Sequence, residues 1–357
     1  MARILVSWPG RGYDIVIEPG LLQQTRRLVT EFELDGRVAV GTTVRIAALH
    51  GAALAERLPN AALLTMPDGE EHKSLATVAQ LYRELVAAGL DRHGTLVALG
   101  GGVACDVFGF AATTYLRGLR LVMAPTSLLA MVDASVGGKT GVDLAEGKNL
   151  VGTFAQPAAV LVDTDLLTTL PPGEWRNGMA EVLKHGLLAD DSLLDPALHQ
   201  RERAEELVCR AVQVKVDIVQ QDPLERGIRA HLNLGHTFAH AIELVTNFRW
   251  SHGEAVGFGL VAAARLSHAV GLCAAALVDV VEDVVARSGL PIRLNGIDSE
   301  AICAAMATDK KRRSGRLRFV LLRALHDATL VDDVEMTTVI EVLDSLQGVA
   351  RREDASC

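Results

Sequence analysis

The chain has 357 residues, of which 49% are apolar and 22% are charged. These proportions are typical of a folded globular protein and exclude a disordered chain, and the length is sufficient for more than one domain. The formal net charge of -9 argues against a protein that coats nucleic acid or lies on a membrane surface.

Apolar runs and cysteines indicate the compartment. No apolar run approaches the roughly 20 residues that a membrane-spanning helix needs, and the apolar stretch at the N-terminus is too short for a signal peptide. The five cysteines, Cys105, Cys209, Cys273, Cys303 and Cys357, are scattered and form no C-x-x-C pair. An odd number of scattered cysteines is typical of reduced thiols, so the sequence predicts a cytoplasmic protein without a structural zinc ribbon.

The first half of the chain alternates short β-branched runs with a helical pattern. Because the runs are continuously apolar, they are typical of buried strands in a largely parallel sheet. The helical pattern stops at Gly89, as helices often stop at glycine. Strands are predicted at 37–40, 62–66, 94–102, 119–125 and 158–165, and a helix at 74–90.

Two prolines and a glycine, in the segment 170–173, separate this half from the next. Beyond them the chain is rich in alanine, leucine and valine at helical spacing, up to a predicted strand pair at 317–322 and 327–331. The sequence therefore predicts an α/β domain with a Rossmann-like parallel sheet, then a mostly α-helical domain and a short tail. The predicted boundaries are 1–170, 171–350 and 351–357.

Two glycine clusters suggest sites for anions. In the first, a strand leads into Gly100, Gly101 and Gly102 and then into a helical pattern, an arrangement that brings backbone N–H groups close to a pyrophosphate. The strict G-x-G-x-x-G spacing fails, because Cys105 stands where the third glycine would be. The second cluster is the segment 132–152, in which Lys139 and Lys148 lie beside glycines. These lysines would suit a phosphate or a carboxylate. Structural turns and solvated loops are the alternative for both clusters.

Three histidines, His236, His240 and His252, lie in one short segment. A catalytic metal needs about three protein ligands and an open position, and Glu181 could supply a carboxylate. The alternatives are that the histidines belong to the core and that Glu181 forms a surface ion pair with Lys184, three residues later. Spacing alone leaves open which two of the histidines bind a metal.

A series of segments between residues 60 and 325 carries the most specific signal. They read PDGEEHKSL, LGGGVACDVFGF, TTYLRG, APTSLLAMVDASVGGKTGVDLAEGKNLVG, AEVLKHG, RAHLNLGHTFAHAIE, SHGEAVG and DKKRRSGRLRFVLL. In this order they resemble the 3-dehydroquinate synthases, which are members of the sugar-phosphate cyclase family. The resemblance implies the fold of that family, an α/β NAD-binding domain followed by an α-helical metal- and substrate-binding domain.

The resemblance also implies an activity, that of a phosphate-eliminating carbon–oxygen lyase in the shikimate pathway of aromatic amino acid biosynthesis. The substrate would be 3-deoxy-D-arabino-heptulosonate 7-phosphate, and the products would be 3-dehydroquinate and phosphate. The implied steps are oxidation by NAD, elimination of phosphate, return of the hydride from the same cofactor and an intramolecular aldol closure. The implied cofactors are NAD and Zn2+ or Co2+, which suit the same ligands.

In the family, the metal is held by the glutamate of the AEVLKHG-like segment and the histidines of GHT and HGE, which here are Glu181, His236 and His252. The resemblance leaves His240 as an acid–base or proton-relay group beside the metal. It implies a homodimer, because the residue that matches Arg117 reaches the phosphate from the partner subunit. The positions that would surround the substrate are Arg117, Asp133, Lys139, Asn149, Lys184, Lys215, Arg229, Asn233 and Lys310.

The positions that match the NAD site of the family follow the predicted strands. The resemblance implies that Glu70 contacts the ribose or adenine, and that Gly102 and Val103 line the pyrophosphate. The full set is Asp68, Gly69, Glu70, Glu71, His72, Lys73, Gly102, Val103, Ala104, Cys105, Asp106, Thr126, Ser127, Lys139, Lys148, Leu166, Leu167, Thr168 and Thr169.

The sequence departs from the family pattern at four positions. Cys105 replaces the usual glycine before the aspartate, Ser127 replaces threonine, and Thr168 stands where lysine is expected. Gly41 stands where the family commonly offers an aspartate to the adenosine ribose. The last change predicts weaker binding of NAD without an effect on the chemistry.

Other functions are considered beside this one. Related cyclases make aminodehydroquinate, 2-deoxy-scyllo-inosose or valiolone, but substrates without a carboxylate would not need the full set Arg229, Asn233 and Lys310. Aminodehydroquinate synthases tend to lose the lysine that matches Lys184. A metal-dependent polyol dehydrogenase has less use for so many phosphate-binding lysines, and a non-catalytic binding protein is expected to have lost at least one metal-site residue. This chain has every residue that these comparisons require. They are Lys184, Arg229, Asn233 and Lys310 for the substrate, and Glu181, His236, His240 and His252 at the metal site.

Overall fold

The structure, a computed structural model, describes residues 1–8, 11–312, 317–332 and 334–348, with the backbone alone at 8, 11 and 307–312. The chain folds into two compact units. The first comprises Met1–Trp175 and Gln200–Leu224, and the second comprises Arg176–His199 and Glu225–Cys357. Among the described residues, no helix is both long enough and apolar enough to cross a membrane.

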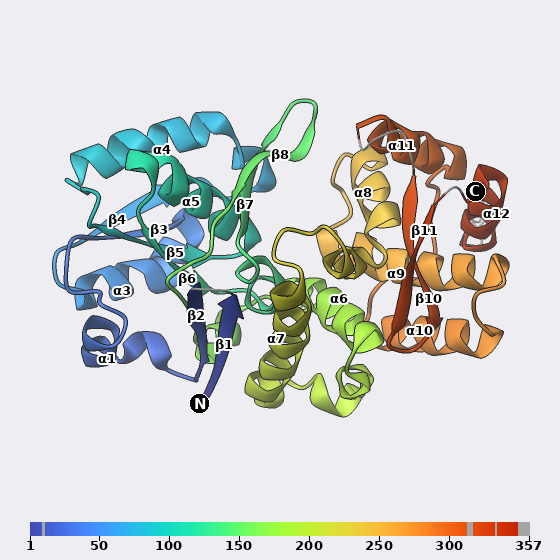
Figure 1. The fold of residues 1–357 in the computed structure, drawn as a ribbon, viewed down its shortest axis with the longest axis horizontal. Helices are drawn as coiled ribbons and strands as arrows, with labels where there is room; N and C mark the ends of the chain where they lie inside the picture. The colour runs from blue at the N-terminus through green and yellow to red at the C-terminus, as the bar shows by residue number, and fades with distance from the viewer. Residues whose placement is uncertain (9–10, 313–316, 333, 349–357) are drawn as a thin grey trace, which may run out of the picture. The chain divides into compact units, whose positions relative to one another are not determined.

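A seven-stranded sheet forms the centre of the first unit (Figure 1). Its strand order is β1-β2-β9-β6-β5-β3-β4, and all neighbours are parallel except the β1–β2 pair at one edge. The parallel strands are short and almost wholly apolar, as expected where both faces of a sheet are covered. The strands are β1 Ala2–Trp8, β2 Arg11–Ile17, β3 Val38–Thr43, β4 Ala61–Met66, β5 Thr95–Gly100, β6 Arg120–Pro125 and β9 Ala159–Val162.

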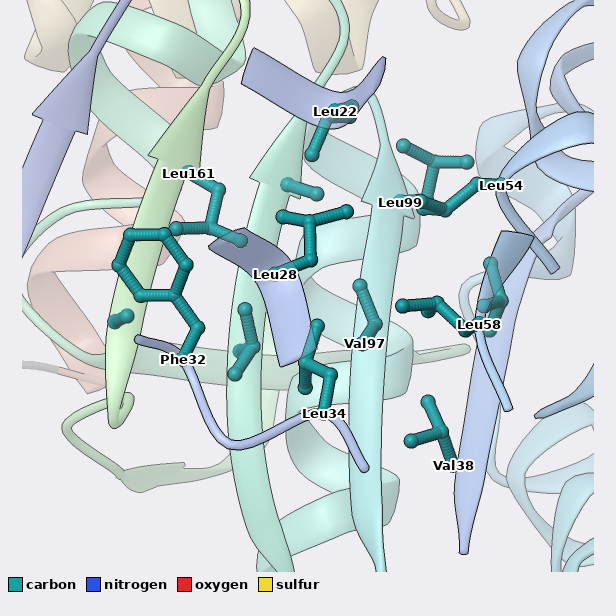
Figure 2. Packing of buried hydrophobic residues seen from close by; sticks show 14 of the residues in the cluster. Leu22, Leu28, Phe32, Leu34, Val38, Leu54, Leu58, Val97, Leu99 and Leu161 are labelled. Atoms are coloured by element: carbon teal, nitrogen blue, oxygen red, sulfur yellow. The ribbon is translucent and has the colours of Figure 1, made fainter. Parts of the chain in front are cut away.

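Alternate residues of these strands face two different layers. On one face, valines and leucines of the strands pack against Leu28 of α1 and against Phe32 and Leu34, which follow that helix, and against Leu54 of α3 (Figure 2). Helix α5 packs against β3, β5 and β6. The helices of this unit are α1 Thr25–Thr30, α2 Val44–Ile46, α3 Ala52–Arg57, α4 Leu75–Ala87, α5 Gly102–Thr114 and α7 Ala204–Gln221.

A separate antiparallel hairpin, β7 Lys139–Leu144 with β8 Gly147–Phe154, also belongs to the first unit. Glycines allow its two strands to come close, because a Cβ at Gly141 would lie 2.7 Å from the carbonyl oxygen of Val151. Helix α7 packs against β1 and β2, although it lies far from them in the sequence.

The second unit is mostly helical (Figure 1). Its longest helix, α9, is mostly buried and contacts α8, α10, α12 and β10, so it forms the centre of the unit. A short antiparallel hairpin, β10 with β11, completes the core. The elements are α6 Pro172–Leu188, α8 His236–Val245, α9 His252–Ala269, α10 Ala275–Arg287, α11 Ser299–Arg312, β10 Arg318–Ala324, β11 Asp327–Asp332 and α12 Met336–Ser345.

The predicted fold class, an α/β part with a parallel sheet and a mostly α-helical part, is confirmed. Besides the hairpin β7–β8, two features were not predicted. The N-terminal hairpin β1–β2 extends the sheet, and the segment Gln200–Leu224 belongs to the first unit although it follows the predicted boundary at residue 170. The reason for the second difference is the packing of α7 on β1 and β2, a contact between distant segments that local sequence patterns do not show. The predicted tail at 351–357 lies outside the described residues.

Candidate active site

Most of the positions expected to bind NAD follow the carboxyl ends of the parallel strands. Residues 68–73 follow β4, residues 102–106 follow β5, and Thr126 and Ser127 follow β6. The segment Thr164–Thr169, a 3-10 helix that contains Leu166, Leu167, Thr168 and Thr169, follows β9. Because these strands are parallel, their carboxyl ends lie at the same edge, where open α/β sheets bind ligands.

The loop between β5 and α5 fits a pyrophosphate. Strand order reverses beside β5, since β6 lies on one side of it and β3 on the other. Helix α5 begins at Gly102, and its N-cap residue, Gly101, has no side chain that could cap the helix. The first N–H groups of the helix are therefore available to an anion. Cys105, the departure in this motif, is fully buried, and burial raises the pKa of its thiol far above the ordinary value.

The structure explains the glycine at position 41. Gly41 lies in β3 with its Cα facing α5, and a Cβ there would overlap the ring of Phe108. An aspartate at this position would therefore require the Phe108 ring to move.

Lys73 connects residues that the sequence assigns to different ligands. Its Nζ atom donates to Oδ2 of Asp106 at 2.6 Å and to Oδ1 of Asn149 at 2.6 Å. The backbone N–H of Asn149 donates to Oδ1 of Asp143 at 2.7 Å. Burial would lower the pKa of the Lys73 ammonium, but Asp106 and Glu70 outweigh burial and raise it. Lys73 is therefore a buried cation held by its neighbours.

Two other lysines among the predicted site residues of this unit form ion pairs with carboxylates. Nζ of Lys215, on α7, donates to the carbonyl oxygen of Asp133 at 2.6 Å and lies 2.8 Å from its Oδ1 atom. Nζ of Lys148 lies 3.3 Å from Oε1 of Glu70. The side chain of Lys139, at the start of β7, is exposed.

Arg117 lies in a short 3-10 helix, Tyr115–Arg117, after α5. Leu116 and Arg117 both have positive φ, 50° and 68°, a conformation that is costly for residues with a Cβ. Both side chains are exposed.

Three helices of the second unit bring Glu181, His236 and His252 together. Glu181 lies in the middle of α6, while His236 and His252 are the first residues of α8 and α9. Gly235, with φ 79°, turns the chain into α8, and a Cβ at Gly259 of α9 would overlap the carbonyl group of Gly235. The glycines therefore allow α9 to pass close to the start of α8, where His236 lies.

The distances within this cluster suit a small metal ion. Nε2 of His252 lies 3.1 Å, and Nε2 of His236 lies 3.5 Å, from Oε1 of Glu181. Zinc bonds to nitrogen and oxygen of about 2.0–2.2 Å in a tetrahedral arrangement place neighbouring ligand atoms about 3.3–3.6 Å apart. The Glu181 side chain is fully buried, whereas 31% of the His252 side chain is exposed. The cluster therefore has the ligand types and spacing of a metal site that solvent or substrate can reach.

Each histidine has an acceptor at its other ring nitrogen. Nδ1 of His236 lies 3.2 Å from the carbonyl oxygen of Leu234, and Nδ1 of His252 lies 3.3 Å from Oε1 of Glu243. A proton on Nδ1 can be donated to these acceptors, which leaves both Nε2 atoms to bind a metal ion. The sequence analysis missed Glu243, which lies two helical turns after His236 on α8.

The charges in the cluster shift three pKa values. Burial would raise the pKa of Glu181, but Lys184, His236 and His252 outweigh it and hold the pKa well below its ordinary value. Burial, together with Lys184, lowers the pKa of His236 to about 3. Burial would also lower the pKa of His252, but hydrogen bonds with Glu181 and Glu243 raise it to about 10.

The other predicted residues of this unit lie as follows. The His240 ring lies one turn after His236, with the two ring centroids 5.5 Å apart, and is exposed. The cluster of Glu181, His236 and His252 does not include it. Lys184 is buried and forms an ion pair with Glu181. Arg229, which is buried, and Asn233 share the 3-10 helix Ile228–Asn233.

Lys310 lies in the last turn of α11, among residues whose side chains are outside the described part of the structure.

Comparison with solved structures defines the class of protein. The fold is similar to that of 2-epi-5-epi-valiolone synthase from Streptomyces hygroscopicus with NAD+ and Zn2+ bound, with a TM-score of 0.87 and 31% identity over 95% of this chain and 98% of that one. It is similar to 2-deoxy-scyllo-inosose synthase complexed with carbaglucose-6-phosphate, NAD+ and Co2+, with a TM-score of 0.87 and 25% identity over 96% and 99% of the chains. The fold and the metal-ligand cluster thus define a sugar-phosphate cyclase.

Sequence comparison narrows the class to one family. The family models for the N-terminal and C-terminal parts of 3-dehydroquinate synthase match residues 63–177 and 178–312. The 3-dehydroquinate synthase of Pelobacter propionicus is 43% identical over 93% of this chain and 96% of its own, and that of a Synechococcus species is 42% identical over 96% and 98%. The chain belongs to the 3-dehydroquinate synthase family.

A probable glycerol dehydrogenase from Sinorhizobium meliloti shares the fold alone, with a TM-score of 0.61, 17% identity and coverage of 93% and 95% of the two chains.

Proposed function

We propose that the chain converts 3-deoxy-D-arabino-heptulosonate 7-phosphate to 3-dehydroquinate and phosphate, with NAD and Zn2+ or Co2+ as cofactors. The observation that carries the proposal is the cluster of Glu181, His236 and His252, in a chain whose sequence belongs to this family. When bound, NAD would take up and return a hydride, and the metal ion would polarise the substrate oxygens that it binds. Four described cysteines are free thiols, which supports a cytoplasmic location.

The cofactor positions divide between the units. Glu181, His236 and His252 would hold the metal, and the uncapped N-terminus of α5 would hold the pyrophosphate of NAD. Lys184 balances the buried charge of Glu181. This balance keeps Glu181 ionised and so able to bind a cation, as its lowered pKa indicates.

The chain's polar side chains would bind and orient the substrate. Lys139, Asn149, Arg229 and Lys310 are proposed to lie near its carboxylate and phosphate, because a doubly charged phosphate and a carboxylate need several cations and donors. His240 is proposed to transfer protons, since its ring is exposed and lies beside the His236 ring. Asp133, Lys184, Lys215 and Asn233 complete the proposed set of substrate residues.

The proposal is tested by following phosphate release and absorbance by NADH together, with purified protein, zinc and the heptulosonate phosphate. We expect many phosphates per NAD, no accumulation of NADH, and loss of activity on chelation that zinc restores. Accumulation of NADH without phosphate would instead indicate a polyol dehydrogenase. If neither signal appears, the same assay with sedoheptulose 7-phosphate and glucose 6-phosphate tests the other cyclase activities.

We also propose that the chain forms a homodimer in which Arg117 acts on the partner's substrate. The exposed side chains of Leu116 and Arg117, held in a strained backbone conformation, support a contact outside the subunit. Mixing the variants Arg117→Ala and Glu181→Ala, each inactive alone, tests this proposal. If Arg117 acts across the dimer, random exchange of subunits restores about a quarter of the wild-type sites. The reason is that about half of the dimers are mixed, and one of the two sites in each mixed dimer is intact. If Arg117 acts within its own subunit, mixing restores nothing.

A further inference from the structure

Glu243 is a buried carboxylate that the metal-ligand cluster leaves outside. Only 3% of its side chain is exposed, and its Oε1 atom lies 3.3 Å from Nδ1 of His252. The Nε2 atom of the same ring faces Glu181 at 3.1 Å. One imidazole is thus held at both nitrogens, by one carboxylate in the cluster and by another outside it.

The position of Glu243 along its helix explains this contact. His236 begins α8, and Glu243 follows seven residues later, two helical turns along the same face. Helix α8 therefore supplies one ligand, His236, and also contacts a second ligand, His252, which begins the next helix.

We propose that Glu243 is a positioning residue for the metal site, which accepts the Nδ1 proton of His252 and thereby holds Nε2 toward the metal. A ligand histidine must present a lone pair, and a fixed acceptor at Nδ1 selects both the tautomer and the orientation of the ring. The corresponding acceptor for His236 is the carbonyl oxygen of Leu234, which the backbone holds in place. His252 is different, because its orientation depends on a side chain that can be replaced.

The inference rests on the proposed metal site, and zinc affinity tests it without substrate or NAD. The full chain, stripped of metal, is titrated with zinc against a competing chelator as wild type, Glu243→Gln and Glu243→Leu. We expect a loss of affinity of about 10- to 100-fold for Glu243→Leu and a smaller loss for Glu243→Gln, which keeps an acceptor oxygen. The matched control is Glu282→Gln, since Glu282 is also a helical carboxylate of this unit but pairs with Arg265 instead.

Absorption spectra of the Co2+ forms add a readout that a general loss of stability would not change. We expect an altered ligand-field spectrum for Glu243→Leu and a spectrum close to wild type for Glu243→Gln. The inference is overturned if Glu243→Leu binds zinc as tightly as wild type, or if Glu282→Gln loses as much affinity. If Glu243→Leu does not fold, equal affinities of Glu243→Gln and Glu282→Gln overturn it. Failure of wild type to bind zinc would refute the proposed function itself.

Discussion

At the scale of single residues, Lys73 of the first unit holds two other predicted site residues. Only 5% of its side chain is exposed, and its ammonium group holds both Asp106, assigned to the NAD site, and Asn149, assigned to the substrate. Burial raises the pKa of Asp106, and Lys73 only partly offsets this effect. Asp106 therefore depends on Lys73 for its charge balance.

Replacement of Lys73 by methionine should destabilise the protein by about 3 kcal/mol, because it leaves a largely buried carboxylate without its cation. Chemical denaturation measures the loss. Adding Asp106→Asn should recover part of it, since the uncompensated charge is then removed. The control is Lys148→Met: the Lys148–Glu70 pair is more exposed and should contribute less than about 1 kcal/mol. Equal losses for the two lysines would contradict the prediction.

The sequence indicates site residues by type and motif but not by contact. Glu181, His236 and His252 could be proposed because their motifs resemble those of a family, and the structure brings them together. Glu243 could not, because a glutamate on an amphipathic helix is ordinarily a solvated residue, and its role depends on a contact with the next helix. Lys73 was assigned to the cofactor for its motif, but the hydrogen bonds of its ammonium group to Asp106 and Asn149 could be found only in the structure.

At the scale of elements, the metal cluster depends on how two helices begin. His252 follows the N-cap residue Ser251, whose hydroxyl accepts from the backbone of Glu254, while the Glu254 carboxylate accepts from the backbone of Ser251. This capping box fixes the first turn of α9, to which the histidine belongs.

The variant Ser251→Ala should cost about 1 kcal/mol in stability and should also weaken zinc binding several-fold, because the first turn of α9 loses its cap. Ser74→Ala is the matched control, since Ser74 caps α4 in the first unit through the backbone of Thr77. Its loss of stability should be similar and its zinc affinity unchanged. Thermal unfolding and zinc titration compare the two variants, and a parallel loss of zinc affinity in both would rule out the local effect.

The contact between α8 and α9 leads to a second prediction for the elements. Gly259→Ala places a methyl group against the carbonyl of Gly235, which is backbone and next to His236, so we expect a loss of about 3 kcal/mol and of zinc binding. Gly257→Ala, one half turn away, meets only the Leu290 side chain at 3.0 Å and should cost about 1 kcal/mol with zinc binding retained. Circular dichroism and zinc titration measure both effects; zinc binding by Gly259→Ala would disprove the argument.

Buried elements could be predicted from the sequence more readily than exposed ones. The strands β3, β4, β5, β6 and β9 were predicted because β-branched runs between turns are typical of a parallel sheet. The edge strand β1 was missed, since Leu5 is 60% exposed and the alternation of apolar and polar residues is weak. The hairpin β7–β8 was interpreted as a phosphate-binding loop because of its glycines, which in the structure let two strands approach.

At the scale of the whole molecule, each unit contains the candidate residues for one cofactor. All three proposed metal ligands belong to the second unit, and all proposed NAD positions belong to the first. A ligand that binds only the folded form stabilises the part that forms its site, by about 3 kcal/mol at 100 times its Kd.

Hydrogen exchange should therefore distinguish the two cofactors. Removal of zinc by a chelator is expected to accelerate exchange in α6, α8 and α9, while addition of NAD should slow it at the start of α5 and in the segment Thr164–Thr169. Mass spectrometry of peptides from the exchanged protein measures both. The assignment of cofactors to units fails if zinc changes exchange only in the first unit.

The place of α7 has a consequence for biosynthesis. The N-terminal part of a chain leaves the ribosome first. The segment Arg176–His199, which belongs to the second unit, therefore emerges before Gln200–Leu224, which completes the first unit. His252 follows 71 residues after Glu181, so the metal cluster cannot close until the whole first unit, and the second unit as far as residue 252, have emerged. We therefore expect a nascent chain that ends at residue 175 to be incompletely folded and prone to aggregate, and zinc to be acquired only late in translation.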